Sequence, residues 1–178
     1  MNLKDRKRKL IYEYAEDECK LLKIFKNNEK RKKYLLDLAE ALKRILEEYS
    51  QVKKDTITLE EIPLLYGLVS IALEGSIKLY FLSKQFEDFI VIRPTERTLS
   101  NLKEKINKTI LSEVKEKLDY LIFVRNHFVH FPLYYTSFHD DEGIFLEVIR
   151  FFVEKSGFSE IIPQKLFESQ KRDSYEQN

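Results

Sequence analysis

Apolar side chains recur at helical spacing along most of this chain, and this pattern constrains its fold more than any other feature. In one stretch they stand three or four residues apart, at Tyr34, Leu35, Leu38, Leu42, Ile45, Leu46 and Tyr49, which is the repeat of an amphipathic helix. Four glycines and four prolines in 178 residues provide few of the turns that an all-β fold needs. We therefore predict an all-α fold, an up-and-down bundle of four to six helices.

Six segments have the pattern of helices: about 3–25, 29–52, 59–85, 98–131, 142–155 and a short 159–168. Thr58 and Glu61 form a capping box at the start of the third segment, and Pro63 suits its first turn. Residues 86–98 are expected to be a connection, after which Thr98 or Ser100 caps the longest helix.

The ends of the later helices are indicated by single residues. Pro132 disfavours helical geometry at the residue before it, so the longest helix should end near Phe131. Asp140 or Asp141 is expected to cap the next helix, and Gly157 to end it.

We expect one domain over residues 1–170, made of a basic helical hairpin (1–54) and a core (58–156), with a flexible tail at 171–178. Residues 1–54 hold sixteen Lys and Arg against ten Asp and Glu, whereas the remainder holds fifteen against twenty. A basic half suits a polyanion, and it equally suits the solvated face of a helix pair. A chain that is 43% apolar and 34% charged is not wholly disordered.

The third predicted helix is apolar almost all round and is long enough to span a membrane. Glu74 and Lys78 lie near its middle and favour the centre of a helical bundle instead, so no membrane partner is expected. The chain opens on polar and basic residues without a signal-peptide pattern, and its lone cysteine, Cys19, suits a reducing compartment. The expected location is the cytoplasm.

The segment most informative about function is residues 125–130, Arg-Asn-His-Phe-Val-His, near the end of the longest helix. Continuing the apolar stripe of Leu118 and Leu121 by one turn reaches Arg125, so an arginine occupies a position that its neighbours mark as core. A buried unpaired charge is unfavourable by several kcal/mol. Arg125 therefore needs a partner, a cleft or a subunit boundary, and Glu74 is the candidate partner within the chain.

The spacing of Arg125, Asn126 and His130 favours a site shared by two copies of the chain. Asn126 and His130 are four residues apart and share a helix face, whereas Arg125 and His130 lie about 140° apart around the axis. One straight helix would not aim both at the same phosphate, but two copies about a two-fold axis would. The apolar surplus between Tyr120 and Phe131 also favours a homodimer.

These residue types suit RNA cleavage without a metal or cofactor. His130 lies in the last helical turn, where the dipole favours a cation, and an imidazole titrating near neutrality is a general acid or base. Arg125 supplies a fork of donors to the phosphate, and Asn126 positions the ribose or the histidine. RNA supplies its own nucleophile, the 2′-hydroxyl, so a cyclic phosphate is the expected product. His127 is either a second acid–base group or a packed side chain.

The sequence Arg125-Asn126-x-x-x-His130 resembles the signature of the HEPN family (higher eukaryotes and prokaryotes nucleotide-binding). Residues 72–78 are similar, more loosely, to an earlier core helix of that family. The resemblance implies a helical bundle that dimerises through the motif helix and cleaves RNA without metal, with Arg125 and His130 catalytic. In many toxin members a tyrosine stands two residues after the histidine, but here Pro132 takes that place.

The sequence thus favours a homodimeric endoribonuclease that acts on RNA as a toxin or antiviral effector, with an antitoxin or regulatory protein as a further partner. One alternative is a catalytically silent module that binds a nucleotide, nucleic acid or protein, with Arg125 paired to Glu74. Another binds nucleic acid through the basic amino-terminal helices without cutting it. His139-Asp140-Asp141 has no recognisable zinc spacing, so no metal site is assigned.

Overall fold

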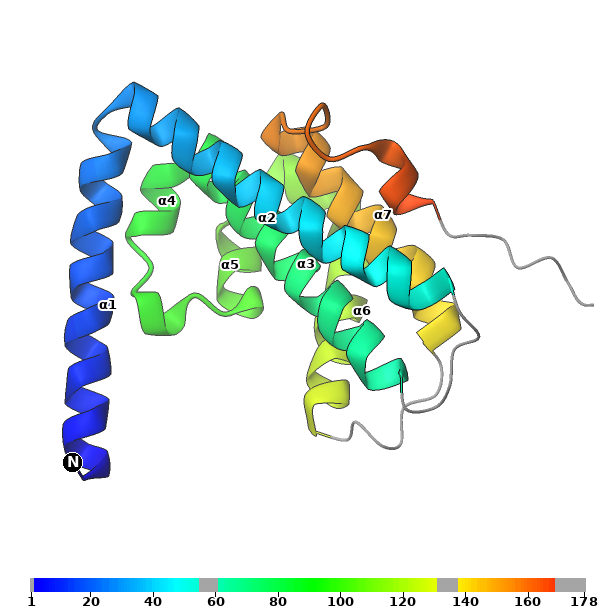
Figure 1. The fold of residues 1–178 in the computed structure, drawn as a ribbon, viewed down its shortest axis with the longest axis horizontal. Helices are drawn as coiled ribbons and strands as arrows, with labels where there is room; N and C mark the ends of the chain where they lie inside the picture. The colour runs from blue at the N-terminus through cyan, green and yellow to red at the C-terminus, as the bar shows by residue number, and fades with distance from the viewer. Residues whose placement is uncertain (1, 55–60, 131–137, 169–178) are drawn as a thin grey trace, which may run out of the picture.

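The computed structural model describes residues 2–54, 61–130 and 138–168, and the regular structure of these residues is all helical (Figure 1). The elements are α1 (Leu3–Phe25), α2 (Asn28–Lys54), α3 (Ile62–Lys84), α4 (Phe86–Ile90), the 3₁₀ turn η1 (Pro94–Glu96), α5 (Leu99–Lys105), α6 (Lys108–His130), α7 (Phe138–Ser156) and the 3₁₀ turn η2 (Gln164–Phe167). The predicted all-α class is confirmed.

The centre of the fold is α3, which packs mainly against α7 and α2 and also meets α6. Its side chains are buried on several sides, and those without any exposed surface include Leu65, Tyr66, Val69, Leu73, Ile77 and Phe81. A helix that is apolar almost all round needs neighbours on more than one side. This requirement explains why α2, α6 and α7 gather around it.

Among the described residues, α3 is the one helix that is long and apolar enough to cross a membrane, judged by length and composition. Half of its apolar window is buried inside the molecule. The core helix of a soluble protein has the same length and composition.

Helices α1 and α2 are joined through Lys26 and Asn27, in the gap between the predicted segments 3–25 and 29–52. The Asn27 side chain accepts a hydrogen bond from the Lys30 backbone at 3.0 Å and so caps the start of α2. The buried ring of Phe25 stacks on Phe86 at 4.2 Å and fixes the carboxyl end of α1. The amino end of α1 runs past α4 and α5 and away from the other helices (Figure 1).

The prediction of one long helix from residue 98 to 131 is wrong, because the chain turns between α5 and α6. Ile106 has an extended backbone, and the Asn107 backbone donates to the side chain of Gln85 at 3.0 Å. The side chain of Asn107 then accepts from the Thr109 backbone at 2.9 Å and caps the new helix. The apolar pattern did not predict this turn, because Ile106 is buried just as it would be in a continuous helix. The predicted cap at Thr98 is confirmed.

Three other predictions need correction. Residues 86–98 are not only a connection, since they contain α4 and η1. The last predicted helix, 159–168, is reduced to η2. Helix α7 begins at Phe138, so Asp141 lies inside it and does not cap it, because its carboxylate is turned inward towards tyrosine hydroxyls. Gly157 ends α7 with a φ of 86°, as predicted.

Helix α3 is described from Ile62, and its predicted start near residue 59 lies outside the described residues. Glu61 precedes the helix without a side-chain capping bond, and Pro63 occupies its first turn. Thr58, Phe131, Pro132 and the tail 171–178 lie outside the described residues.

Candidate functional site

Helix α6 carries all six residues of the Arg-Asn-His-Phe-Val-His segment, and it ends at His130. Its inward stripe includes Leu118, Leu121 and Val124, all buried. Phe128 continues this stripe, and its ring stacks on that of Tyr66 in α3 at 4.7 Å. This stack fixes the rotation of the last turns of α6 and so decides which of its residues face outward.

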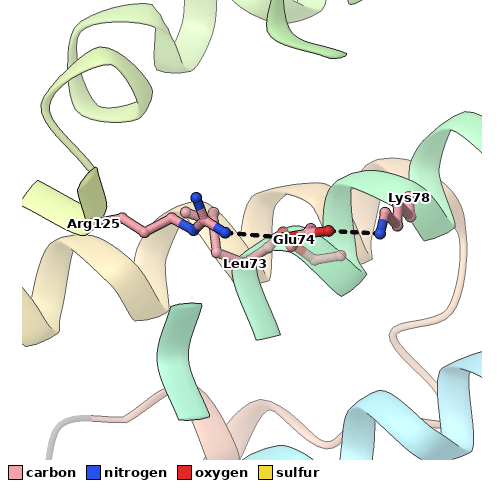
Figure 2. A network of polar contacts seen from close by, with 5 residues as sticks. Leu73, Glu74, Lys78 and Arg125 are labelled. Atoms are coloured by element: carbon pink, nitrogen blue, oxygen red, sulfur yellow. Dashed lines mark hydrogen bonds and ion pairs between the residues drawn. The ribbon is translucent and has the colours of Figure 1, made fainter. Parts of the chain in front are cut away.

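Arg125 lies at the edge of the buried stripe and pairs with Glu74 of α3 (Figure 2). Its Nη2 stands 3.5 Å from Oε2 of Glu74, and the other oxygen of Glu74 accepts from Lys78 at 2.6 Å. The two side chains of the pair are 31% and 29% exposed. The pair that the sequence suggested therefore forms, but at the surface and not in the core. A guanidinium has five N–H donors, and this long contact engages one of them.

Asn126 and His127 point away from the core and are exposed. The imidazole of His127 lies against the ring of Phe123, with ring centres 6.3 Å apart and planes inclined by 21°. Phe123 is itself 68% exposed. Positions 123, 126, 127 and 130 share one side of an α-helix, and we call this side the outer face of α6.

His130 is the last residue of α6, one turn after Asn126. Its backbone belongs to the same continuous helix as Arg125, so the predicted angle of about 140° between the two positions applies. The side chain of His130 lies outside the described part of the structure.

A shallow hollow of about 280 Å³ opens between α2 and α3 beside the carboxylate of Glu74. Its lining is mainly apolar and consists of Leu38, Ala41, Leu42, Ile45, Ile71, Glu74, Gly75 and Lys78. Glu74 therefore lines a surface depression as well as pairing with both Arg125 and Lys78.

A buried polar cluster links four helices close to the start of α7, and the sequence analysis did not find it. Asp141 accepts hydrogen bonds from the hydroxyls of Tyr66 and Tyr120, at 2.7 and 2.5 Å. Glu142 accepts from Tyr49 and pairs with Lys53. Asp141 and Glu142 are both buried. The available signal was a run of acids directly before the apolar stretch of α7.

The surroundings of Tyr49 in this cluster favour the protonated form of its hydroxyl. Burial, together with the neighbouring Glu142 carboxylate, raises the pKa of Tyr49 well above its ordinary value. The Tyr49 hydroxyl therefore stays a donor, and its bond to Glu142 joins α2 to α7.

Metal ligands do not gather in the part of the chain that the structure describes. No group of three or more His, Cys, Asp or Glu side chains is arranged there to hold an ion. Comparison with known proteins gives no further assignment. No family model, no curated protein and no solved structure matches this chain.

Proposed function

We propose that this chain is a metal-independent endoribonuclease of HEPN type, acting as a homodimer through the outer face of α6. The observation that supports this most is the placement of Arg125, about a third exposed, next to the exposed Asn126, on a helix that ends at His130. An arginine and an amide are thus accessible from solvent on the helix that also carries His130.

The outer face of α6 has the character of a subunit interface. Phe123 exposes most of its ring there, beside His127 and Asn126. Exposed aromatic surface of this kind is enriched at protein interfaces. Two copies of α6 that cross at their last two turns about a two-fold axis would bring Arg125 of each chain near position 130 of the other. One helix then does not have to direct positions 125 and 130, about 140° apart, at the same phosphate.

In the proposed reaction the ribose 2′-oxygen attacks the adjacent phosphorus, and the bond from phosphorus to the 5′-oxygen breaks. A His130 imidazole takes the proton of the 2′-hydroxyl, and the departing 5′-oxygen receives a proton from an imidazolium or water. The Arg125 guanidinium stabilises the extra negative charge on the phosphate oxygens. The products are a 2′,3′-cyclic phosphate and a 5′-hydroxyl.

The direct test is to incubate the purified chain with unstructured RNA in excess chelator, beside His130→Ala. We expect cleavage by the parental chain, ends that carry a 2′,3′-cyclic phosphate, and loss of cleavage in the variant. Mass spectrometry of the products identifies the ends. Cleavage that requires added metal, or that persists in folded His130→Ala, contradicts the proposal.

A composite site predicts rescue between two inactive variants. When Arg125→Ala and His130→Ala chains are mixed and allowed to exchange subunits, mixed dimers contain one intact arginine and one intact histidine. We expect cleavage to reappear on mixing, measured with the same RNA. Two inactive variants that stay inactive after proven subunit exchange would show that each chain works alone or not at all.

The interface is tested by placing a charge on the outer face of α6. We expect Phe123→Glu to convert the dimer into a monomer, because a carboxylate would replace an exposed aromatic ring and be buried in the interface. Sedimentation at several concentrations measures the change. Val91→Glu is the matched control, since Val91 is 71% exposed on another part of the molecule. A parental chain that is monomeric at every concentration contradicts the dimer.

A second function is favoured by the ion pair between Arg125 and Glu74 and by the hollow beside Glu74. In that case the chain is a silent helical module in which Arg125 fixes the approach of α6 to α3. The chelator experiment separates the two functions, since a silent module leaves the RNA intact.

The nuclease is proposed to act in the cytoplasm as a toxin or antiviral effector that an antitoxin holds in check. The active chain, expressed without that antitoxin, should arrest growth, and Arg125→Ala should relieve the arrest.

A further inference from the structure

The first turns of α1 carry a dense positive charge. Residues 3–9, here called the basic arm, contain one acid, Asp5, among five cations: Lys4, Arg6, Lys7, Arg8 and Lys9. All seven residues are exposed. The arm therefore presents a net charge of about +4 to solvent, taking Lys and Arg as protonated at neutral pH.

Little in the described structure neutralises this charge. Among the ion pairs of the described residues, one reaches the arm, a 3.7 Å contact between Lys9 and Glu13 that is well exposed at both ends. Such a pair contributes little. The cations also stand at the amino end of a helix, where the peptide dipoles are already positive and disfavour them. A bound anion would offset both unfavourable terms.

The arm also stands clear of the rest of the molecule. Figure 1 shows the amino end of α1 running beyond α4 and α5. Leu3 and Tyr12 are 83% and 73% exposed. Glu18 holds α1 to the rest of the molecule through two hydrogen bonds from Arg97, at 2.6 and 2.9 Å, and Leu21 and Ile24 then pack against the core. The helix is thus anchored from Glu18 onward, whereas residues 3–9 are exposed.

The cations surround the helix axis. At 100° per residue, positions 4, 8, 9, 6 and 7 stand at about 0°, 40°, 140°, 200° and 300°. A helix that lies on a membrane needs one apolar side and one charged side, and the arm lacks this division. A flexible polyanion that wraps or runs beside the helix is able to use cations on every side.

We infer that the basic arm binds the sugar-phosphate backbone of single-stranded RNA. The choice of RNA over another polyanion rests on the proposed function, whereas the binding of phosphates rests on the arm itself. The contacts carry no base specificity, because they are made between cations and phosphates.

The test uses the full chain and an RNA oligonucleotide whose 2′-oxygens are methylated, so that binding is measured without cleavage. The arm variant is Lys4→Gln with Lys7→Gln and Arg8→Gln, which keeps residues of similar helix propensity. We expect its affinity to fall at least tenfold at low salt. The slope of log affinity against log salt should shrink by about 2, since each contact to a single strand contributes about 0.7.

The matched control removes three exposed lysines outside the arm and outside α6, with Lys84→Gln, Lys105→Gln and Lys165→Gln, and so has the same net charge. We expect it to lose less than threefold in affinity. Equal losses in both variants, or no loss in the arm variant, overturn the inference. Release from anionic vesicles by the arm variant, with RNA affinity unchanged, also overturns it and assigns the arm to a membrane surface.

The outcomes for the arm and for the proposed function are separable. If the parental chain binds the methylated RNA through the arm but never cuts ordinary RNA, the proposed nuclease is wrong and the inference stands. If the chain cuts RNA and the arm variant binds as tightly as the parent, the inference is wrong and the nuclease stands.

Discussion

Arg125→Ala is expected to lower the rate of metal-free RNA cleavage by about 10²–10³-fold, the usual loss when one preorganised donor to a developing negative charge is removed. The loss should be catalytic and not structural. The Arg125–Glu74 contact is long, at 3.5 Å, and about a third exposed, and such pairs contribute about 1 kcal/mol or less to stability. Single-turnover kinetics together with thermal unfolding measure both effects.

Two further variants sharpen this prediction. Arg125→Lys keeps the charge but loses the planar fork, so its rate should fall between those of the parent and of Arg125→Ala. Arg150→Ala is the control, because Arg150 is also partly exposed and paired to a glutamate, Glu154, but lies on α7. Its cleavage rate should equal that of the parent. An Arg125→Ala chain that cleaves at the parental rate would refute the assigned role.

Glu74 distinguishes a catalytic arginine from a structural one. In the nuclease, Glu74→Gln removes a competitor for the guanidinium, so RNA cleavage should persist or increase. In the silent module, Glu74 and Arg125 stabilise the same contact, and Glu74→Gln should change only the stability. The comparison requires cleavage and unfolding to be measured on the same preparation.

Lys53→Met is expected to destabilise the fold by about 3–5 kcal/mol, because it leaves the Glu142 carboxylate buried without its cation. The two side chains of this pair are 9% and 7% exposed. The melting temperature should fall by about 6–20 °C, since each kcal/mol shifts a chain of this size by about 2–4 °C. Calorimetry at a fixed chain concentration measures the change.

Two variants identify the unpaired charge as the cause. Adding Glu142→Gln to Lys53→Met removes the charge and keeps an acceptor for Tyr49, so much of the lost stability should return. Lys117→Met is the surface control, because its pair with Glu147 is nearly half exposed on both sides. It should lose less than about 1 kcal/mol. If Lys53→Met is no more harmful than Lys117→Met, the cluster does not stabilise the fold.

The outward placement of Asn126 and His127 was only partly predictable. Helical arithmetic placed Asn126 on the same face as position 130 and left His127 as either an acid–base group or a packed side chain, and the structure exposes Asn126 and His127. The same arithmetic placed Arg125 in the core, but the structure puts it at the margin of the core. Periodicity gives the angle of a residue around its own helix, whereas the packing of α3 against α6 decides how wide the buried stripe is.

The position of Asp141 was predicted wrongly for a different reason. Asp141 looked like a helix cap because acids are common at that position, yet it lies inside α7 and accepts from two tyrosines that come from α3 and α6. Tyr66 and Tyr120 are far from Asp141 in the chain. No local pattern relates the three residues, so the cluster emerges only when the helices are packed.

The sequence by itself determined the all-α class, the course of α1 and α2, and the carboxyl end of α7 at Gly157, because helical periodicity and capping are local properties of the chain. Tertiary structure alone decided the turn between α5 and α6, the surface position of the Arg125–Glu74 pair and the inward turn of Asp141 and Glu142. Each of these three features depends on contacts between residues that are distant in sequence. The free energy of such contacts cannot be inferred from the residues of one short segment.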